Sequence, residues 1–245
     1  MDDKILSFIP KMYLPESVFF GSQSLSFLKT IPSHKKLFVI SSRFNLNNKD
    51  LVKELTYGSG IIFNSGEPTE LDVEKIKKEI KGSKTIIALG GGSIIDLAKI
   101  IKRDLGIKMV AIPTTIGSGA EVSRFSLIID SKTKKKNVIN SPDLLPEVVI
   151  YNPLLFKTIP KQELVYQTID AFSHAIESLV SRISNPASDM LSMVALDNLY
   201  EGLEKISRGK INDEILEKII TASFLAGLAQ SSAATGLAHS FAHYF

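Results

Sequence analysis

The sequence TIIALGGGSIIDLAK, residues 85–99, decides the fold class. It begins with an apolar run, which predicts a buried strand, and ends with apolar residues at helical spacing. The three glycines between them, residues 90–92, carry no side chain, so the backbone is free to take positive φ and a ligand can approach closely. The helix that follows offers unpaired N–H groups and the positive end of its dipole. We therefore expect a strand–turn–helix unit able to bind a phosphate or pyrophosphate.

The same turn has a structural interpretation that needs no ligand. Ser93 would cap the helix, and Asp96, three residues further on, would complete a capping box. The two interpretations are compatible, because a capped helix can still bind an anion. A glycine run alone is weak support for phosphate binding, so the neighbouring segments have to decide.

Short apolar runs alternate with helical patterns over the first 160 residues. Strands are expected at 17–20, 36–41, 61–63, 86–89, 109–112 and 148–150, helices at 50–55, 71–80 and 94–102, and a hairpin at 126–130 and 137–139. This alternation predicts a doubly wound, mainly parallel α/β sheet. Ligands bind outside the carboxyl ends of such strands. We therefore expect a dinucleotide site at Ser41, Ser42, the glycine turn and residues 113–115.

From residue 160 onward the pattern is helical only. Helices are expected at 163–182, 187–206, 214–229 and 233–245. The fold class is thus α/β followed by all-α. We expect a dinucleotide-binding α/β domain at 1–160 and a helical metal- and substrate-binding domain at 161–245.

Composition excludes several classes of protein. The chain has 245 residues, a formal net charge of +3 and no cysteine. Disulfides and thiolate metal sites are therefore excluded, and the charge is too small to argue for a nucleic-acid partner. The amino terminus is acidic where a secretory signal is basic, and no apolar run approaches a membrane span. We expect a cytoplasmic protein with neither a membrane nor a nucleic-acid partner.

Two pairs of side chains suggest a metal site. Asp170 and His174 are four residues apart on one expected helix, and His239 and His243 have the same spacing on another. Each pair projects from one helical face, so two packed helices could surround a divalent cation. The alternative is two amphipathic helices whose polar faces happen to hold histidine. Carboxylate and imidazole without thiolate suit Fe(II), Zn, Mn or Co.

Together these segments resemble the iron-containing (group III) alcohol dehydrogenases, which share the dehydroquinate synthase-like fold with glycerol dehydrogenase. The matching segments are GGGSIIDLAK at 90–99, PTTIGSGAE at 113–121, SPDLLPEVVIYNP at 141–153, DAFSHAIESLVSRISNPASD at 170–189 and GLAHSFAH at 236–243. They occur in the family's order and cover nearly the whole chain.

The resemblance implies a role for each matching residue. The cofactor pyrophosphate would lie on Gly90, Gly91, Gly92 and Ser93, the nucleotide would contact Thr114, Thr115 and Ser118, and Lys136 would reach the nicotinamide ribose. The implied metal ligands are Asp170, His174 and His239. His243 would lie beside the metal and relay the released proton, with Asp96, close to the nicotinamide, as the other candidate for that task. The implied reaction is hydride transfer between a primary or secondary alcohol, or the corresponding aldehyde, and NAD(P), with Fe(II) or Zn as the metal.

Departures from the family pattern qualify this expectation. The family's fourth ligand is a histidine in a later Pro-His-Gly segment, and this sequence stops at Phe245, so the helical domain is expected to be incomplete and the site to have three ligands. Where many relatives have an acidic residue after the second strand, this chain has Ser41, Ser42 and Arg43. Losing a carboxylate and gaining a cation favours a 2′-phosphate, so we predict a preference for NADP.

Three alternatives stay open at this point. The chain would be a dehydroquinate synthase-type enzyme, a glycerol dehydrogenase-like enzyme, or a truncated chain that binds nucleotide but is catalytically incompetent. A homodimer through the early strand at Phe19 and Phe20 is a possible further association.

Overall fold

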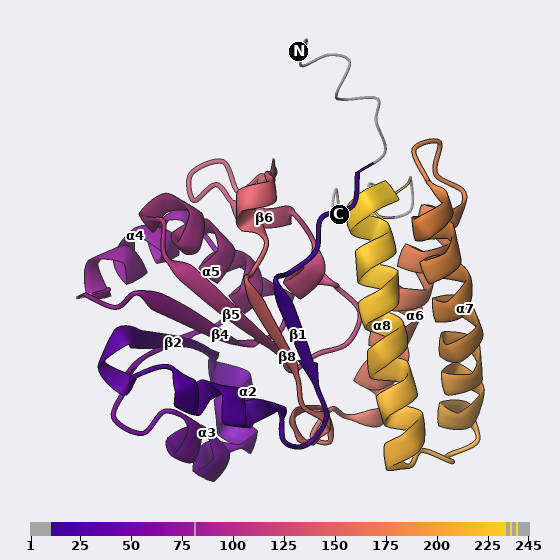
Figure 1. Cartoon of the computed structure of the whole chain (residues 1–245), viewed down its shortest axis with the longest axis horizontal. Helices are drawn as coiled ribbons and strands as arrows, with labels where there is room; N and C mark the ends of the chain where they lie inside the picture. Colours follow the sequence, from indigo (N-terminus) through magenta and orange to yellow (C-terminus); the bar gives the residue numbers. More distant parts are fainter. Residues whose placement is uncertain (1–10, 81, 234–235, 237–238, 240–245) are drawn as a thin grey trace.

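The computed structural model in Figure 1 describes residues 11–80, 82–233, 236 and 239. Its centre is a six-stranded sheet in which every neighbouring pair of strands is parallel. In spatial order the strands are β1 (Ser17–Phe20), β8 (Val148–Tyr151), β5 (Lys108–Pro113), β4 (Thr85–Gly90), β2 (Lys36–Ser41) and β3 (Gly60–Asn64). The predicted α/β class is confirmed.

The inner strands are continuous apolar runs because both of their faces are covered. All six residues of β4 are buried, and so are five of six in β2 and five of six in β5. The register pairs Ile40 with Leu89 and Gly90 with Pro113, so these strands end at one edge of the sheet. The backbone N–H of Thr114 donates to the carbonyl of Gly90 and continues this register by one residue. This edge positions the cleft described below.

Helices connect and cover the parallel strands. They are α2 (Ser42–Asn47), α3 (Lys49–Leu55), α4 (Glu70–Glu79) and α5 (Gly92–Leu105). Short 3₁₀ helices lie at Ser24–Thr30, Ser33–Lys35, Ala120–Val122, Pro142–Leu144 and Pro153–Phe156. The sequence did not predict α2. It is only six residues long, and the Ser41 side chain, which accepts from the N–H of Phe44, supplies its amino-terminal cap.

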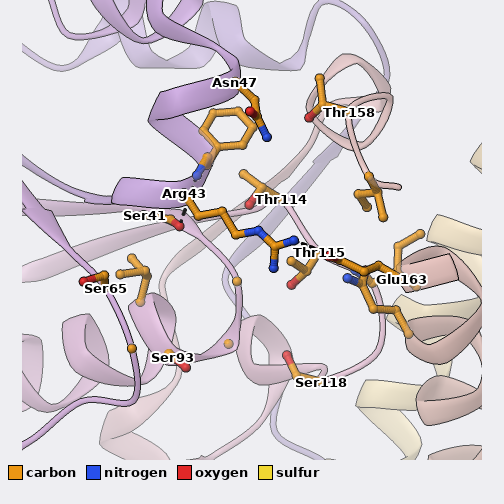
Figure 2. Close-up of a pocket in the computed structure, with 18 of the residues that line it drawn as sticks. Ser41, Arg43, Asn47, Ser65, Ser93, Thr114, Thr115, Ser118, Thr158 and Glu163 are labelled. Atoms are coloured by element: carbon orange, nitrogen blue, oxygen red, sulfur yellow. Dashed lines mark hydrogen bonds and ion pairs between the residues drawn. The ribbon is translucent and has the colours of Figure 1, made fainter. Parts of the chain in front are cut away.

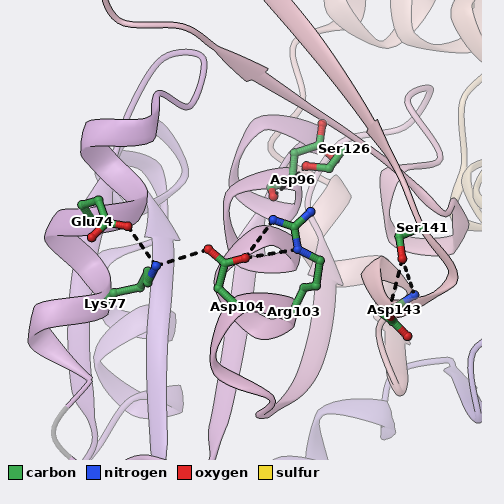
Figure 3. A network of polar contacts seen from close by, with 8 residues as sticks. All are labelled: Glu74, Lys77, Asp96, Arg103, Asp104, Ser126, Ser141 and Asp143. Atoms are coloured by element: carbon green, nitrogen blue, oxygen red, sulfur yellow. Dashed lines mark hydrogen bonds and ion pairs between the residues drawn. The ribbon is translucent and has the colours of Figure 1, made fainter.

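A separate hairpin of β6 (Phe125–Ile129) and β7 (Lys136–Asn140) packs against α5. Figure 3 shows Ser126 of β6 beside Asp96 of α5, and the Ser126 hydroxyl donates to the Asp96 carbonyl at 3.0 Å. The same view shows Lys77 of α4 bridging to Asp104 near the end of α5. Helix α5 is therefore tied to its neighbours at both ends.

The rest of the described chain is a bundle of three long helices. These are α6 (Lys161–Leu179), α7 (Pro186–Ser207) and α8 (Asp213–Ala233), and Figure 1 shows them packed beside the β1 and β8 side of the sheet. The all-helical second part is thus confirmed. The predicted end of the third helix at residue 229 was wrong, because α8 continues to Ala233 with its last residues buried. The predicted helix at 233–245 lies almost wholly outside the described residues.

Aromatic rings join the sheet to the bundle. The ring of Phe20 on β1 lies 5.1 Å from that of Tyr151 on β8 and 5.3 Å from that of Phe224 on α8. Phe19 stacks on Phe27 at 4.9 Å. Both early phenylalanines thus have partners within the chain, and the homodimer stays a prediction, as does the division into two domains.

Candidate functional site: a nucleotide cleft beside a metal-binding cluster

A cleft of about 470 Å³ opens at the carboxyl ends of β2, β4 and β5. One wall is the glycine turn, a second is the loop after β5, a third is the start of α2, and α6 closes the far side (Figure 2). The predicted cofactor residues that line it are Ser41, Arg43, Gly91, Gly92, Ser93, Thr114, Thr115 and Ser118. Segments far apart in sequence therefore meet where an α/β sheet places its ligand.

The glycine turn is shaped by close approach and not by positive φ. Gly91 has φ −81° and ψ −173°, and none of residues 90–92 has the positive φ that we expected. A Cβ on Gly91 would lie 2.8 Å from Oγ1 of Thr115, closer than side chains pack. Gly91 is also the residue before α5, so the expected cap by Ser93 and capping box with Asp96 are wrong. The bare turn and the first N–H groups of α5 remain suited to a pyrophosphate.

The loop after β5 reaches from the cleft to the helical bundle. Gly117 has φ +115°, and a Cβ there would lie 2.8 Å from Oδ2 of Asp170 on α6. Its N–H donates to the Ser223 hydroxyl of α8 at 3.1 Å, and the N–H of Ile116 donates to Oε1 of Gln167 at 2.9 Å. A glycine is required here, both for its backbone conformation and for its contact with α6.

Three predicted metal ligands meet where this loop touches α6. Among the described residues, Asp170, His174 and His239 form the one cluster of potential ligands, with ligand atoms all within 4.8 Å of one another. The two imidazole rings stack with centroids 4.1 Å apart, and Nε2 of His239 lies 3.4 Å from Oδ1 of Asp170. Asp170 also lines the cleft, so the cluster adjoins the glycine turn's cavity.

Hydrogen-bond acceptors that are not themselves in the metal cluster orient both histidines. Nδ1 of His174 lies 3.0 Å from the Gly117 carbonyl, and Nδ1 of His239 lies 2.6 Å from Oε2 of Glu177. A carbonyl or an ionised carboxylate only accepts, so each Nδ1 carries a proton, and in the neutral ring each Nε2 presents its lone pair. Histidines that bind metals are held in this way. The Nε2 of His239 then faces an oxygen of the Asp170 carboxylate. Both atoms are electron-pair donors, and a divalent cation would accept from both. The donor set therefore fits the expected metal.

The pKa values of the two rings are shifted in opposite directions: that of His174 is lowered and that of His239 is raised. Burial lowers the pKa of His174 to about 4, which keeps this imidazole neutral and available as a ligand. Burial also acts to lower the pKa of His239, but hydrogen bonds to Asp170 and Glu177 outweigh it and raise the pKa. A proton and a metal ion thus compete for the same side of His239.

Asp96 lies in a second cavity of about 250 Å³ that adjoins the first through Gly92, Ser93 and Ser118. Its carboxylate accepts from the N–H of Leu127 at 3.1 Å and lies 3.5 Å from Nζ of the fully buried Lys99. Burial raises the pKa of Asp96, although Lys99 opposes this, and burial lowers the pKa of Lys99. These contacts give Asp96 a structural role, and its catalytic role stays a prediction.

The remaining predicted residues divide into three groups. Lys136 lines the second cavity and pairs with Glu67 at 2.6 Å. Gly90 lies under the cleft against Ile94 and Ser41, and the Ser42 hydroxyl donates to the carbonyl of Asn64 at 3.1 Å, so neither residue lines the cleft. His243 lies outside the described residues.

Comparison with known proteins places these features in a family. The family model described as "Iron-containing alcohol dehydrogenase" matches residues 15–153, more than half of the chain, and "Fe-containing alcohol dehydrogenase family, C-terminal" matches residues 164–245. The chain belongs to the iron-containing alcohol dehydrogenase family.

Individual relatives agree with this assignment. The chain is 31% identical to the NADPH-dependent butanol dehydrogenase of Clostridium saccharobutylicum, over 94% of this chain and 66% of that protein. It is 30% identical to aldehyde-alcohol dehydrogenase 2 of Entamoeba histolytica, over 94% of this chain and 31% of that protein. The solved alcohol dehydrogenase from Oenococcus oeni superposes with a TM-score of 0.86 at 26% identity, over 96% of this chain and 70% of that one. The chain thus spans about a third to two thirds of the length of these two curated relatives.

The candidate site of this family member also involves residues that the sequence did not single out. Glu177 contacts His239, Gln167 holds the loop after β5, and Glu163 pairs with Arg43 across the cleft. A signal for Glu177 existed, since it lies three residues after His174 on the same helical face. The other two depend on contacts between α6 and the sheet, which sequence spacing does not report.

Among the described residues no helix is both long and apolar enough to span a membrane. The cytoplasmic location stays a prediction.

Proposed function

We propose that this chain carries the cofactor and metal sites of an alcohol dehydrogenase that transfers a hydride between NAD(P) and a primary or secondary alcohol or its aldehyde. One observation carries the proposal. Asp170, a member of the three-residue metal cluster, lines the same cleft as Gly91, Gly92 and Ser93. A metal-binding group and a phosphate-binding turn that share one cavity suit a reaction between an alcohol and a dinucleotide.

Different residues of the chain would bind different parts of the dinucleotide. The N–H groups at the start of α5 would bind the pyrophosphate, since the helix dipole and the bare turn favour an anion there. Thr114, Thr115 and Ser118 line the cleft, and their hydroxyls would contact the nucleotide. Lys136, in the adjoining cavity, would reach the nicotinamide ribose.

Asp170, His174 and His239 would hold a divalent ion, with Fe(II) and Zn as the proposed choices. When bound, that ion would act as a Lewis acid that stabilises negative charge on the alcohol oxygen, while the hydride leaves for the nicotinamide. The alcohol proton would pass to solvent through His243, with Asp96 as the alternative relay.

NADP is the proposed preference. β2 ends at Ser41 and α2 begins at Ser42, and the next residue, Arg43, lines the cleft. A guanidinium binds a 2′-phosphate well, whereas an acidic residue at this place would have favoured a free ribose hydroxyl. The butanol dehydrogenase relative is NADPH-dependent by its name, which supports the same preference.

Elemental analysis and turnover test the proposal together. Purified with Fe(II) or Zn²⁺, the unmodified 245-residue chain is expected to retain one ion, and His239→Ala is expected to retain none. Reduction of NADP⁺ by short alcohols, followed by absorbance of the reduced cofactor, should accompany the bound metal. Full metal content in His239→Ala would contradict the ligand assignment. Metal retention without net reduction of NADP⁺ would contradict the reaction.

A further inference from the structure

We propose that Glu177 is a positioning residue, which fixes the tautomer of His239 and holds the backbone near it so that Nε2 points at the metal position. The inference rests on the proposed function, because it takes Asp170, His174 and His239 as the ligands. It adds to that set a residue that binds no metal itself.

Glu177 makes several contacts with the segment that carries His239. Its Oε2 accepts from Nδ1 of His239 at 2.6 Å and from the N–H of Gly236 at 2.7 Å. Its Oε1 lies 3.4 Å from the backbone N of His239, which donates to it. The carboxylate is largely buried, with a side-chain exposure of 11%. One carboxylate thus anchors the His239 ring and the backbone N–H groups of Gly236 and His239 to α6.

Close packing reinforces this anchor. A Cβ on Gly236 would lie 3.1 Å from Cδ of Glu177, so the main chain lies directly against the carboxylate. Charge-assisted hydrogen bonds of this length are about twice as strong as neutral ones. We infer that the path of the chain at Gly236 and the direction of the His239 ring are set together by Glu177.

The geometry separates this role from that of a fourth ligand. Glu177 takes the Nδ1 side of the imidazole, whereas Asp170 lies on the Nε2 side, 3.4 Å away. An ion bound at Nε2 is therefore on the opposite edge of the ring from the Glu177 carboxylate. A carboxylate on the outer nitrogen also makes the imidazole a stronger electron donor. Glu177 would thus raise metal affinity through His239 alone.

Glu177→Gln tests the inference with little change of shape. Gln keeps one carbonyl oxygen but replaces the other acceptor with an NH₂ group, so it cannot accept both from Nδ1 and from the backbone N–H of His239 as the two carboxylate oxygens do. Glu204→Gln on α7 is the matched control, because Glu204 pairs on the surface with Arg208. Three readouts are taken on the whole 245-residue chain: Co²⁺ affinity by calorimetry with the visible spectrum of bound Co²⁺, ADP affinity, and the ¹⁵N shifts of the His239 ring without metal.

Glu177→Gln is expected to weaken Co²⁺ binding about 10- to 100-fold, as outer-sphere variants commonly do, and to alter the Co²⁺ spectrum. ADP affinity should stay unchanged, which would show that the sheet and its cleft are intact. The ring shifts should move from the Nδ1–H tautomer toward a mixture of tautomers. Glu204→Gln should change none of the three.

Two outcomes would overturn the inference: ring shifts identical to those of the unmodified chain, or Co²⁺ affinity and spectrum both unchanged. The ring shifts need no metal, so they separate this inference from the proposed function. If the unmodified chain bound no Co²⁺ while Glu177→Gln still changed the tautomer, the proposed metal site would fail, and the positioning of His239 by Glu177 would be supported.

Discussion

Arg43 of α2 and Glu163 in the first turn of α6 form an ion pair across the nucleotide cleft, and both side chains line it (Figure 2). The arginine that we assign to a 2′-phosphate is therefore held by a carboxylate of the chain itself. A bound 2′-phosphate would have to displace Glu163 or share the guanidinium with it. We therefore predict that Glu163 lowers the affinity for a nucleotide with a 2′-phosphate.

Glu163→Gln should release Arg43 and raise the affinity for 2′,5′-ADP. Arg43 is well exposed, so the pair is worth at most about 1 kcal/mol, and the expected gain is about two- to fivefold. The affinity for 5′-ADP, which has no 2′-phosphate, should not change. Calorimetry with both nucleotides measures the ratio of the affinity for 2′,5′-ADP to that for 5′-ADP, and no metal is needed.

The control for this experiment is Glu204→Gln, which removes the carboxylate from another exposed arginine pair, away from the cleft. It should leave both affinities unchanged. An unaltered ratio of the two affinities in Glu163→Gln, or a loss of binding of both nucleotides, would contradict the competition.

Gly91→Ala should destabilise the fold through one contact. Its Cβ would lie 2.8 Å from Oγ1 and 3.1 Å from Cγ2 of Thr115 but an ordinary 3.6 Å from the Thr115 Cβ. Overpacking of this kind costs about 1–3 kcal/mol in the free energy of unfolding. Thr115→Ala in the same chain should recover most of that loss, since it removes the two close atoms. Urea denaturation of both single variants and the double variant completes the cycle, and additive effects would show that the contact is not the cause.

The buried carboxyl of Glu121 should make the free energy of unfolding depend on pH. Burial raises the pKa of Glu121 above its ordinary value of 4.5, even though Tyr151 donates to it at 2.5 Å. Between pH 4.5 and the folded-state pKa, the folded protein holds a proton that the unfolded chain releases, so stability falls as pH rises through this window. Glu121→Gln keeps an acceptor for Tyr151 and removes the titration. Its free energy of unfolding should therefore vary less with pH.

Urea denaturation at several pH values from 4 upward would measure this difference. Glu214→Gln, at an exposed position on α8, is the control and should follow the unmodified chain. A Glu121→Gln variant with the same pH dependence as that control would show that Glu121 does not carry the effect.

The sheet could be predicted because its strands are buried on both faces. Residues in β2 and β4 such as Phe38 and Ile87 are fully buried, and a strand of this kind leaves an unbroken apolar run in the sequence. The ligands of the metal cluster were also accessible from sequence, since Asp170 and His174 are one helical turn apart on α6. His239 was singled out with His243 by the same spacing on another expected helix, and the family resemblance then assigned His239 as the ligand. It meets Asp170 and His174 only through folding.

What sequence could not supply depends on contacts between distant elements. The glycine turn was interpreted through positive φ and the close approach of a ligand, whereas Thr115, in the loop after β5, is what excludes a side chain at Gly91. Ser93 and Asp96 have the spacing of a capping box, but the Asp96 carboxylate faces Leu127 of the hairpin and Lys99 instead. A local pattern cannot report that a neighbouring element competes for the same side chain.

The loop after β5, which contains Gly117, limits how this protein can be re-engineered. Its threonine and serine side chains face the nucleotide cleft, while its Gly117 carbonyl holds His174. Substitutions in this loop would therefore disturb both halves of the site together. Cofactor preference is better altered at Arg43 and Glu163, on the rim, where the histidine supports are left intact.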